Sequence, residues 1–145
     1  MEINKAIRKA YFQALNGNVL DKDTNPIPFY DVYAIPEDVN YPYCLLSSQT
    51  ATQLNIKRCK RYNTTMLIDI VTGATDPIGR AESEDIAEQI EDIVNPDTFI
   101  DLDLTADGYQ LGNTTKESDT YLTDRNDVYY IYRKLLTYNH LTVKI

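Results

Sequence analysis

The sequence predicts an α+β fold, in which a mostly antiparallel or mixed β-sheet carries an N-terminal helix and a central acidic helix packed on it. Three observations predict it. An apolar stripe at helical spacing opens the chain, a second one lies within residues 77–94, and segments before and after it alternate or are rich in β-branched and aromatic residues. The chain has 145 residues, 43% of them hydrophobic, which suits one compact domain over 1–145 and excludes wholesale disorder.

The first helix is predicted over residues 3–15. Its apolar residues recur at helical spacing and form one stripe: Ile3, Ile7, Ala10, Tyr11, Ala14 and Leu15. The residues largely away from the stripe are Lys5, Arg8, Lys9 and Gln13. Gly17 is placed to end the helix, because glycine adopts the left-handed conformation without steric cost. The helix is short and only mildly basic, so we expect it to pack on a core rather than on a membrane.

Three strands are predicted before the second helix. After a polar connector over 18–28, the segments 29–35, 43–54 and 61–72 alternate or are rich in β-branched and aromatic residues. The second and third of these form a hairpin. The third is expected to be central in the sheet and buried on both faces, with Asp69 as an exception that needs a partner.

The second helix is predicted over residues 77–94. Asp76 caps its start, Pro77 takes the first helical position, and Asn95-Pro96 ends it. Its apolar stripe consists of Ile86, Ile90, Ile93 and Val94. Acids fill much of the remaining surface: Glu82, Glu84, Asp85, Glu88, Glu91 and Asp92. At about 1.5 Å per residue, a helix of roughly 25 Å can cross one face of a small sheet.

The rest of the chain is predicted to consist of strands and turns. Residues 100–104 alternate apolar and acidic side chains and predict a half-buried strand, and Asp107-Gly108 predicts a turn. Residues 112–120 are expected to form a polar loop, the best candidate for a mobile segment. Residues 128–138 also fit a helical stripe, but their β-branched and aromatic content favours a strand. Residues 141–145 would add a short terminal strand.

Composition limits the classes of function. The chain has 22 acidic and 14 basic residues, a formal net charge of −8, so it is a poor general DNA binder, although DNA could still pass through a lumen without being gripped. The start shows no signal peptide, and no segment approaches the roughly 20 apolar residues of a membrane-spanning helix. In the predicted hairpin Cys44 and Cys59 lie beyond disulfide reach, which indicates free thiols in a reducing compartment.

Few residues indicate catalysis. The single histidine, His140, is expected to be structural or solvent-facing rather than a catalytic base. No Cys/His cluster, phosphate-binding glycine loop or nucleophile elbow is present, so we expect no cofactor and no metal. Asp101 and Asp103 share one face of a predicted strand, about 6.5 to 7 Å apart. Together with Asp69 they define an alternative function, a small metal-dependent carboxylate enzyme.

Two charged clusters are candidate contact surfaces. One gathers at the turn of the predicted hairpin: Lys57, Arg58, Lys60 and Arg61. The other lies on the predicted acidic helix: Glu84, Glu88 and Glu91. Each either keeps the surface solvated or contacts a partner of opposite charge. In a homo-oligomer the basic turn of one copy could contact the acidic helix of the next, and such heterologous contacts generate rings when they close.

The order of motifs along the chain carries a family resemblance. The motifs are the helix Ile3 to Leu15; Tyr33 to Pro42 followed by Tyr43-Cys44-Leu45-Leu46; Tyr62 to Thr72 followed by Gly79 and the acidic helix; and Tyr132-Arg133-Lys134-Leu135-Leu136. In this order they resemble the tail-completion or tail-terminator family of tailed bacteriophages, small proteins at the head–tail junction. The twelve tyrosines add modest support, because tyrosine is enriched at protein interfaces.

The resemblance implies a structural virion protein and no enzyme. It implies assembly into a ring, commonly six-fold, that contacts tail-tube and neck proteins while DNA passes through its lumen without specific binding. It also implies location at the head–tail junction of a virion that is assembled in the cytoplasm of a bacterial host. Two alternatives stay open besides the enzyme: a neck adaptor or stopper ring below the portal, and a host-encoded acidic adaptor domain that binds a partner peptide as a monomer.

Overall fold

A computed structural model describes residues 1–31, 35–37, 40–56, 58–75, 80–97 and 102–145. Two helices and five strands follow one another along these residues, with a short 3-10 helix before the fourth strand. Their bounds are α1 Ile3–Leu15, β1 Phe29–Asp31, β2 Tyr43–Ile56, β3 Cys59–Ala74, α2 Arg80–Val94, η1 Thr105–Asp107, β4 Tyr109–Arg125 and β5 Tyr130–Lys144.

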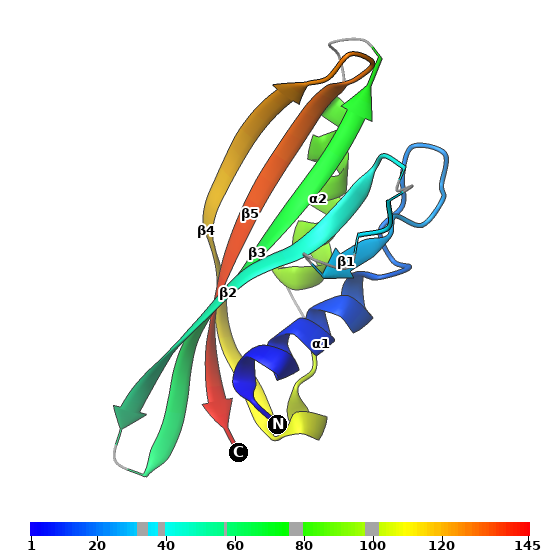
Figure 1. The fold of residues 1–145 in the computed structure, drawn as a ribbon. Helices are drawn as coiled ribbons and strands as arrows, with labels where there is room; N and C mark the ends of the chain where they lie inside the picture. The colour runs from blue at the N-terminus through cyan, green and yellow to red at the C-terminus, as the bar shows by residue number, and fades with distance from the viewer. Residues whose placement is uncertain (32–34, 38–39, 57, 76–79, 98–101) are drawn as a thin grey trace.

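The strands form one mixed sheet in the order β1-β2-β3-β5-β4. The short β1 runs parallel to β2, and the other neighbouring strands are antiparallel. Both helices lie on the same side of this sheet (Figure 1). The predicted α+β fold with a mixed sheet and two packed helices is therefore confirmed.

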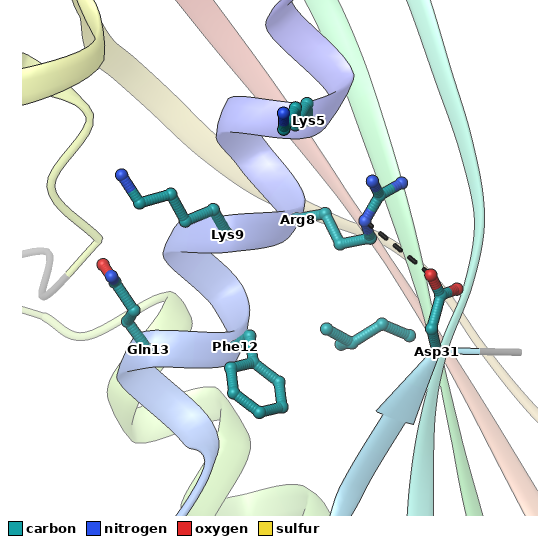
Figure 2. Close-up of a pocket in the computed structure, with 7 residues that line it drawn as sticks. Lys5, Arg8, Lys9, Phe12, Gln13 and Asp31 are labelled. Carbon is teal, nitrogen blue, oxygen red and sulfur yellow. Dashed lines mark ion pairs between the residues drawn. The ribbon is translucent and has the colours of Figure 1, made fainter. Parts of the chain in front are cut away.

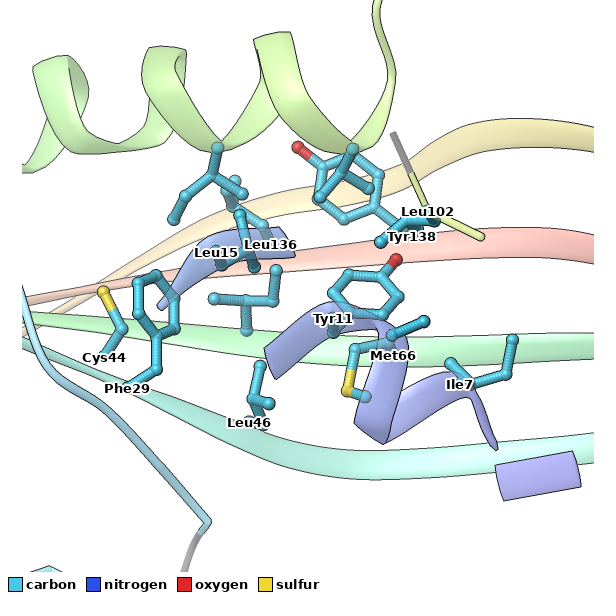
Figure 3. Close-up of a cluster of buried hydrophobic side chains, with 14 of the residues drawn as sticks. Ile7, Tyr11, Leu15, Phe29, Cys44, Leu46, Met66, Leu102, Leu136 and Tyr138 are labelled. Carbon is cyan, nitrogen blue, oxygen red and sulfur yellow. The ribbon is translucent and has the colours of Figure 1, made fainter. Parts of the chain in front are cut away.

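The core lies between the helices and the inner face of the sheet. The α1 stripe is buried as predicted, apart from the half-buried Ala14, and α2 buries Ile86, Ile90 and Val94. Met66 and Ile68 of β3 and Leu136 of β5 meet them from the sheet (Figure 3). Fully burying one such side chain contributes about 1.5–3 kcal/mol, so this shared core holds both helices on the sheet.

The central strand has one covered and one open face. β3 lies third of five, as predicted, and its inner face is buried. On the outer face Asp69 and Val71 are buried, whereas Thr65 and Leu67 are half-exposed. Burial on both faces is therefore confirmed only near Asp69, because both helices pack on the inner side.

The predicted hairpin of β2 and β3 is confirmed, and it separates the two cysteines. Cys44 pairs with Ile70, whereas Cys59 pairs with Ile56 at the hairpin end. Cys44 is buried, Cys59 is exposed, and both thiols are free. Burial, with a smaller contribution from the charge of Asp69, raises the pKa of the Cys44 thiol well above its usual range, so it is held in its neutral form.

Two predictions for the C-terminal third are wrong. Residues 112–120 are not a loop but the middle of β4, paired with β5 through two register shifts. Most of β4 is exposed and lies at the sheet edge, so backbone pairing rather than burial forms it, and no hydrophobic alternation marks it.

The described part of the predicted 100–104 strand, Leu102–Leu104, is outside any strand. Its two leucines are buried in the core, and the Asp103 carboxylate accepts hydrogen bonds from the backbone and side chain of Thr105.

The remaining boundaries follow the sequence closely. The strand preferred over 128–138 is confirmed from Tyr130 onward, and it continues without a break into the predicted terminal strand as β5, which ends at Lys144. Gly17 and Gly108 have positive φ, as their turns require. Three predicted features lie outside the described residues: the helix start at Asp76-Pro77, the basic residue Lys57 and the acidic residue Asp101.

Candidate functional site

The basic cluster lies at the free end of the β2–β3 hairpin, which projects from the body of the sheet (Figure 1). Arg58 and Lys60 are exposed there. Arg61 is half-buried and pairs in register with Leu54 and Val143, so it belongs to the outer sheet face rather than to the tip. Among the described members of this cluster, two cations, Arg58 and Lys60, are therefore fully exposed to solvent.

The acidic cluster on α2 divides in two. Glu84 and Glu88 are exposed, whereas Glu91 is half-buried. The Glu91 carboxylate accepts a hydrogen bond from the Tyr138 hydroxyl and one of 3.1 Å from Asn95 Nδ2. Burial and this bond to a carboxylate raise the pKa of Tyr138, so its hydroxyl stays a donor. Glu91 thus anchors α2 to β5, and Glu84 and Glu88 are the members of this cluster that face solvent.

The basic tip and the acidic helix lie toward opposite ends of the subunit. In Figure 1 the hairpin tip is at the lower left, and α2 extends through the upper half. Within one subunit the structure does not bring these two clusters together. A contact between them would therefore have to join two copies.

The single histidine is structural, one of the two roles expected for it. His140 is fully buried; its Nε2 is hydrogen-bonded to the Tyr11 hydroxyl and its Nδ1 lies 2.8 Å from Thr114 Oγ1. Both partners are hydroxyls that can donate or accept, so a neutral imidazole is satisfied in either tautomer. Burial lowers the pKa of His140 to about 4. The side chain joins α1, β4 and β5 as a neutral group at pH 7.

Of the three carboxylates in the enzyme alternative, the structure describes Asp69 and Asp103, and each has a partner of its own. Asp69 is 2% exposed on the outer face of β3 and forms an ion pair with Arg133 of β5, with Arg133 Nε 3.1 Å from the carboxylate. The bond to Asp69 raises the pKa of Arg133. Asp103 is exposed and holds Thr105. No group of three or more potential metal ligands occurs in the described part of the chain. The partner predicted for Asp69 is thus found, and it is a cation of the protein itself.

A groove beside α1 is a feature that the sequence alone does not show (Figure 2). It has a volume of about 370 Å³ and is lined by Lys5, Arg8, Lys9, Phe12, Gln13, Asp31 and Leu46. The lining is mostly apolar, since it includes Leu46, the aliphatic stems of the basic residues and the 43% exposed Phe12 ring. The signal in the sequence is the basic face of α1, but its partners on β1 and β2 are placed by tertiary packing.

The cations around the groove differ in their pairing. Arg8 Nε lies 3.9 Å from Asp31, and Lys9 Nζ lies 3.4 Å from Asp107. Lys5 forms no ion pair with any residue that the structure describes. The groove therefore combines an apolar lining with a rim that carries excess positive charge, in a chain whose net charge is −8.

Comparison with known proteins gives a match in structure and none in sequence. No protein family and no curated protein matches this sequence. In fold, the chain is similar to a chain of a solved structure described as the virion of a native gene transfer agent (GTA) particle, with a TM-score of 0.60 and 13% identity. The match covers 97% of this chain and 91% of that chain. At this identity the likeness concerns the fold: almost the whole α+β domain has a counterpart in a virion particle.

Separately, none of the described helices is long and apolar enough to cross a membrane.

Proposed function

We propose that this protein is a structural component of a tailed-phage or phage-like virion and forms a ring at the head–tail junction. The observation that carries the proposal is the shared fold: nearly the full length of this chain matches nearly the full length of a chain in a gene transfer agent virion. The order of sequence motifs supports the finer assignment to a tail terminator. The proposal assigns no catalytic step to the protein.

The distribution of charge supports assembly of the protein with itself. The exposed cations of the hairpin tip, Arg58 and Lys60, are separated within one subunit from the exposed members of the α2 cluster, Glu84 and Glu88. Complementary patches on different parts of one surface form heterologous contacts, and these close into a ring when the rotation permits. We propose a ring of six copies. An acidic protein around a lumen offers phosphates little counter-charge, so DNA can pass without being held.

Binding to isolated virion parts tests the position in the virion. The purified protein is mixed with tail tubes and, separately, with portal–neck complexes of the virus that encodes it, and each mixture is sedimented. A tail terminator is expected to pellet with the tail tubes and an adaptor or stopper ring with the neck complexes. Failure to bind either would contradict the proposed function, whereas binding only to the neck would contradict the assignment as terminator.

Charge reversal tests the contact proposed between the basic tip and α2. Reversal of the cluster Lys57, Arg58, Lys60 and Arg61 to Glu should weaken assembly, and the loss should shrink as salt is raised, because screening removes electrostatic attraction between exposed charges. Reversal of only the exposed Arg58 and Lys60, compared with reversal of the exposed Lys22 and Lys144, controls for net charge because each variant reverses two charges. Unchanged assembly of the tip variant would remove this patch from the interface.

A further inference from the structure

The turn between β4 and β5 presents an apolar side chain beside an acid. Val128 is 62% exposed, and the exposed Asp127 precedes it in the chain. Asp127 forms no ion pair with a residue that the structure describes. An exposed apolar side chain next to such an acid is complementary to a partner surface with an apolar recess and basic groups.

The same turn is held in one conformation by its own hydrogen bonds. The Asn126 side-chain oxygen accepts from the backbone N–H of Val128 at 2.9 Å and of Tyr129 at 2.6 Å, and the Asn126 N–H donates to the Tyr129 carbonyl at 3.0 Å. The Tyr129 ring contacts the Tyr41 ring edge-on at 5.3 Å between centroids. Because the turn is already ordered, presenting Val128 to a partner costs little conformational entropy.

The groove beside α1 has the complementary properties. Its apolar lining, with Phe12 and Leu46, can receive an apolar side chain, and Lys5, Arg8 and Lys9 stand around it (Figure 2). The helix α1, which supplies most of the groove lining, lies in the lower half of the subunit, whereas the β4–β5 turn lies at its upper end (Figure 1). One subunit cannot bring its own turn to its own groove, so the two features can be joined only between copies.

We propose that the β4–β5 turn of one copy inserts Val128 into the α1 groove of a neighbouring copy, with Asp127 against the basic rim. This inference rests on the proposed assembly of the protein with itself and names the contact that builds it. The contact is heterologous, as a ring requires. The contact is also compatible with the one proposed between the hairpin tip and α2. In both, an element from the upper half of one subunit in Figure 1 meets an element from the lower half of the next.

Two exposed leucines fit the groove less well. Leu54 and Leu122 lie within strands, so their side chains stand on a sheet surface and not on a projecting turn. Leu54 also pairs with Arg61, which carries the same sign of charge as the groove rim. DNA is a poor occupant, because the groove is mostly apolar and phosphate binding needs clustered cations.

A charge swap tests the proposed contact. Asp127→Lys and Lys5→Glu should each raise the subunit concentration at half-assembly, by about two- to fivefold, the range of one exposed ion pair. The two substitutions combined in one chain should restore assembly, because each contact then again joins opposite charges. Asp97→Lys, at another exposed acid, controls for net charge. Equal losses in the control and in Asp127→Lys, or no restoration in the combined variant, would overturn the contact.

Cysteine cross-linking gives an independent test that does not depend on charge. In a Cys59→Ser background, Val128→Cys and Phe12→Cys are combined in one chain, assembled and oxidised. A disulfide needs Cα atoms within about 7 Å, so a ladder of covalent multimers is expected. Thr52→Cys replaces Phe12→Cys in the control, since Thr52 is exposed and pairs with Asn63 on the outer sheet face.

The outcomes separate this inference from the proposed function. Rings that assemble without the Val128–Phe12 ladder would overturn the contact and leave the virion assignment standing. A protein that neither assembles nor binds tail tubes or neck complexes would overturn the proposed function, and the contact with it. A ladder with Phe12→Cys and none with Thr52→Cys supports both.

Discussion

Burial of His140 should make the stability of the protein depend on pH between about 6.5 and 4. The pKa of this imidazole is about 4 in the folded protein, against an ordinary value of 6.5. In this window the unfolded chain binds a proton that the folded chain does not, so the free energy of unfolding falls as the pH falls. The contribution of the neutral His140 imidazole to the free energy of unfolding is fully present above pH 6.5 and is lost as the pH drops toward 4.

The size of the effect follows from the same two values. One pKa unit corresponds to about 1.4 kcal/mol, and the difference spans about two and a half units. Because the folded imidazole is itself half-protonated at pH 4, the loss between pH 7 and pH 4 is about 3 kcal/mol. Many domains are stable by only about 5–15 kcal/mol, so a large share of the stability depends on one side chain.

Urea unfolding at several pH values measures this loss. His140→Gln cannot titrate in this range and keeps a polar group near Tyr11, so the variant should be less stable at pH 7 but should lack the loss of about 3 kcal/mol between pH 7 and 4. Tyr11→Phe removes a hydrogen-bond partner of the imidazole while keeping the histidine buried, so it should retain the slope. If His140→Gln lost as much stability as the wild-type protein over this window, the imidazole would not be the titrating group.

Three further predictions concern the fold and are measured by urea unfolding or thiol labelling. Arg133→Met leaves the Asp69 carboxylate buried without its cation and should cost about 2–3 kcal/mol; Asp69→Leu in the same chain should recover most of it, and no recovery would contradict the pairing. Gly73→Ala places a Cβ 2.7 Å from a ring carbon of Tyr41 and should cost about 1–3 kcal/mol; an equal cost in a Tyr41→Ala background would mean that the ring is not the obstacle. Under native conditions a thiol reagent should modify one cysteine per chain, Cys59, and a second only in denaturant; rapid modification of both would contradict the buried position of the other.

The sequence predicts the elements that bury an apolar face. The α1 stripe, the β2–β3 hairpin and β5 are all found at or near their predicted positions, because helical or alternating apolar residues mark each of them. The edge strand β4 leaves no such mark. Its residues are mostly exposed, its register shifts twice, and its stability comes from backbone pairing with a strand that follows it in the chain. Composition therefore favoured a loop.

For the candidate surfaces too, the sequence does not show which charged residues are exposed. The sequence predicts two charged clusters, but it does not show that Glu91 is bound to Tyr138 while Glu84 and Glu88 stay exposed. That distinction needs the packing of α2 on β5. Likewise, the basic residues of α1 are visible in the sequence, whereas the groove beside them exists only because β1 and β2 supply its other wall.

Native mass spectrometry of the purified protein shows whether it forms a ring. A closed ring should appear, with a mass that is a whole multiple of the 16.6 kDa subunit, six copies being the expected number. Raising the salt concentration should favour the monomer, since exposed charges contribute to the contact. A strict monomer at all concentrations, which also binds neither tail tubes nor neck complexes, would contradict both the ring and the proposed place in a virion.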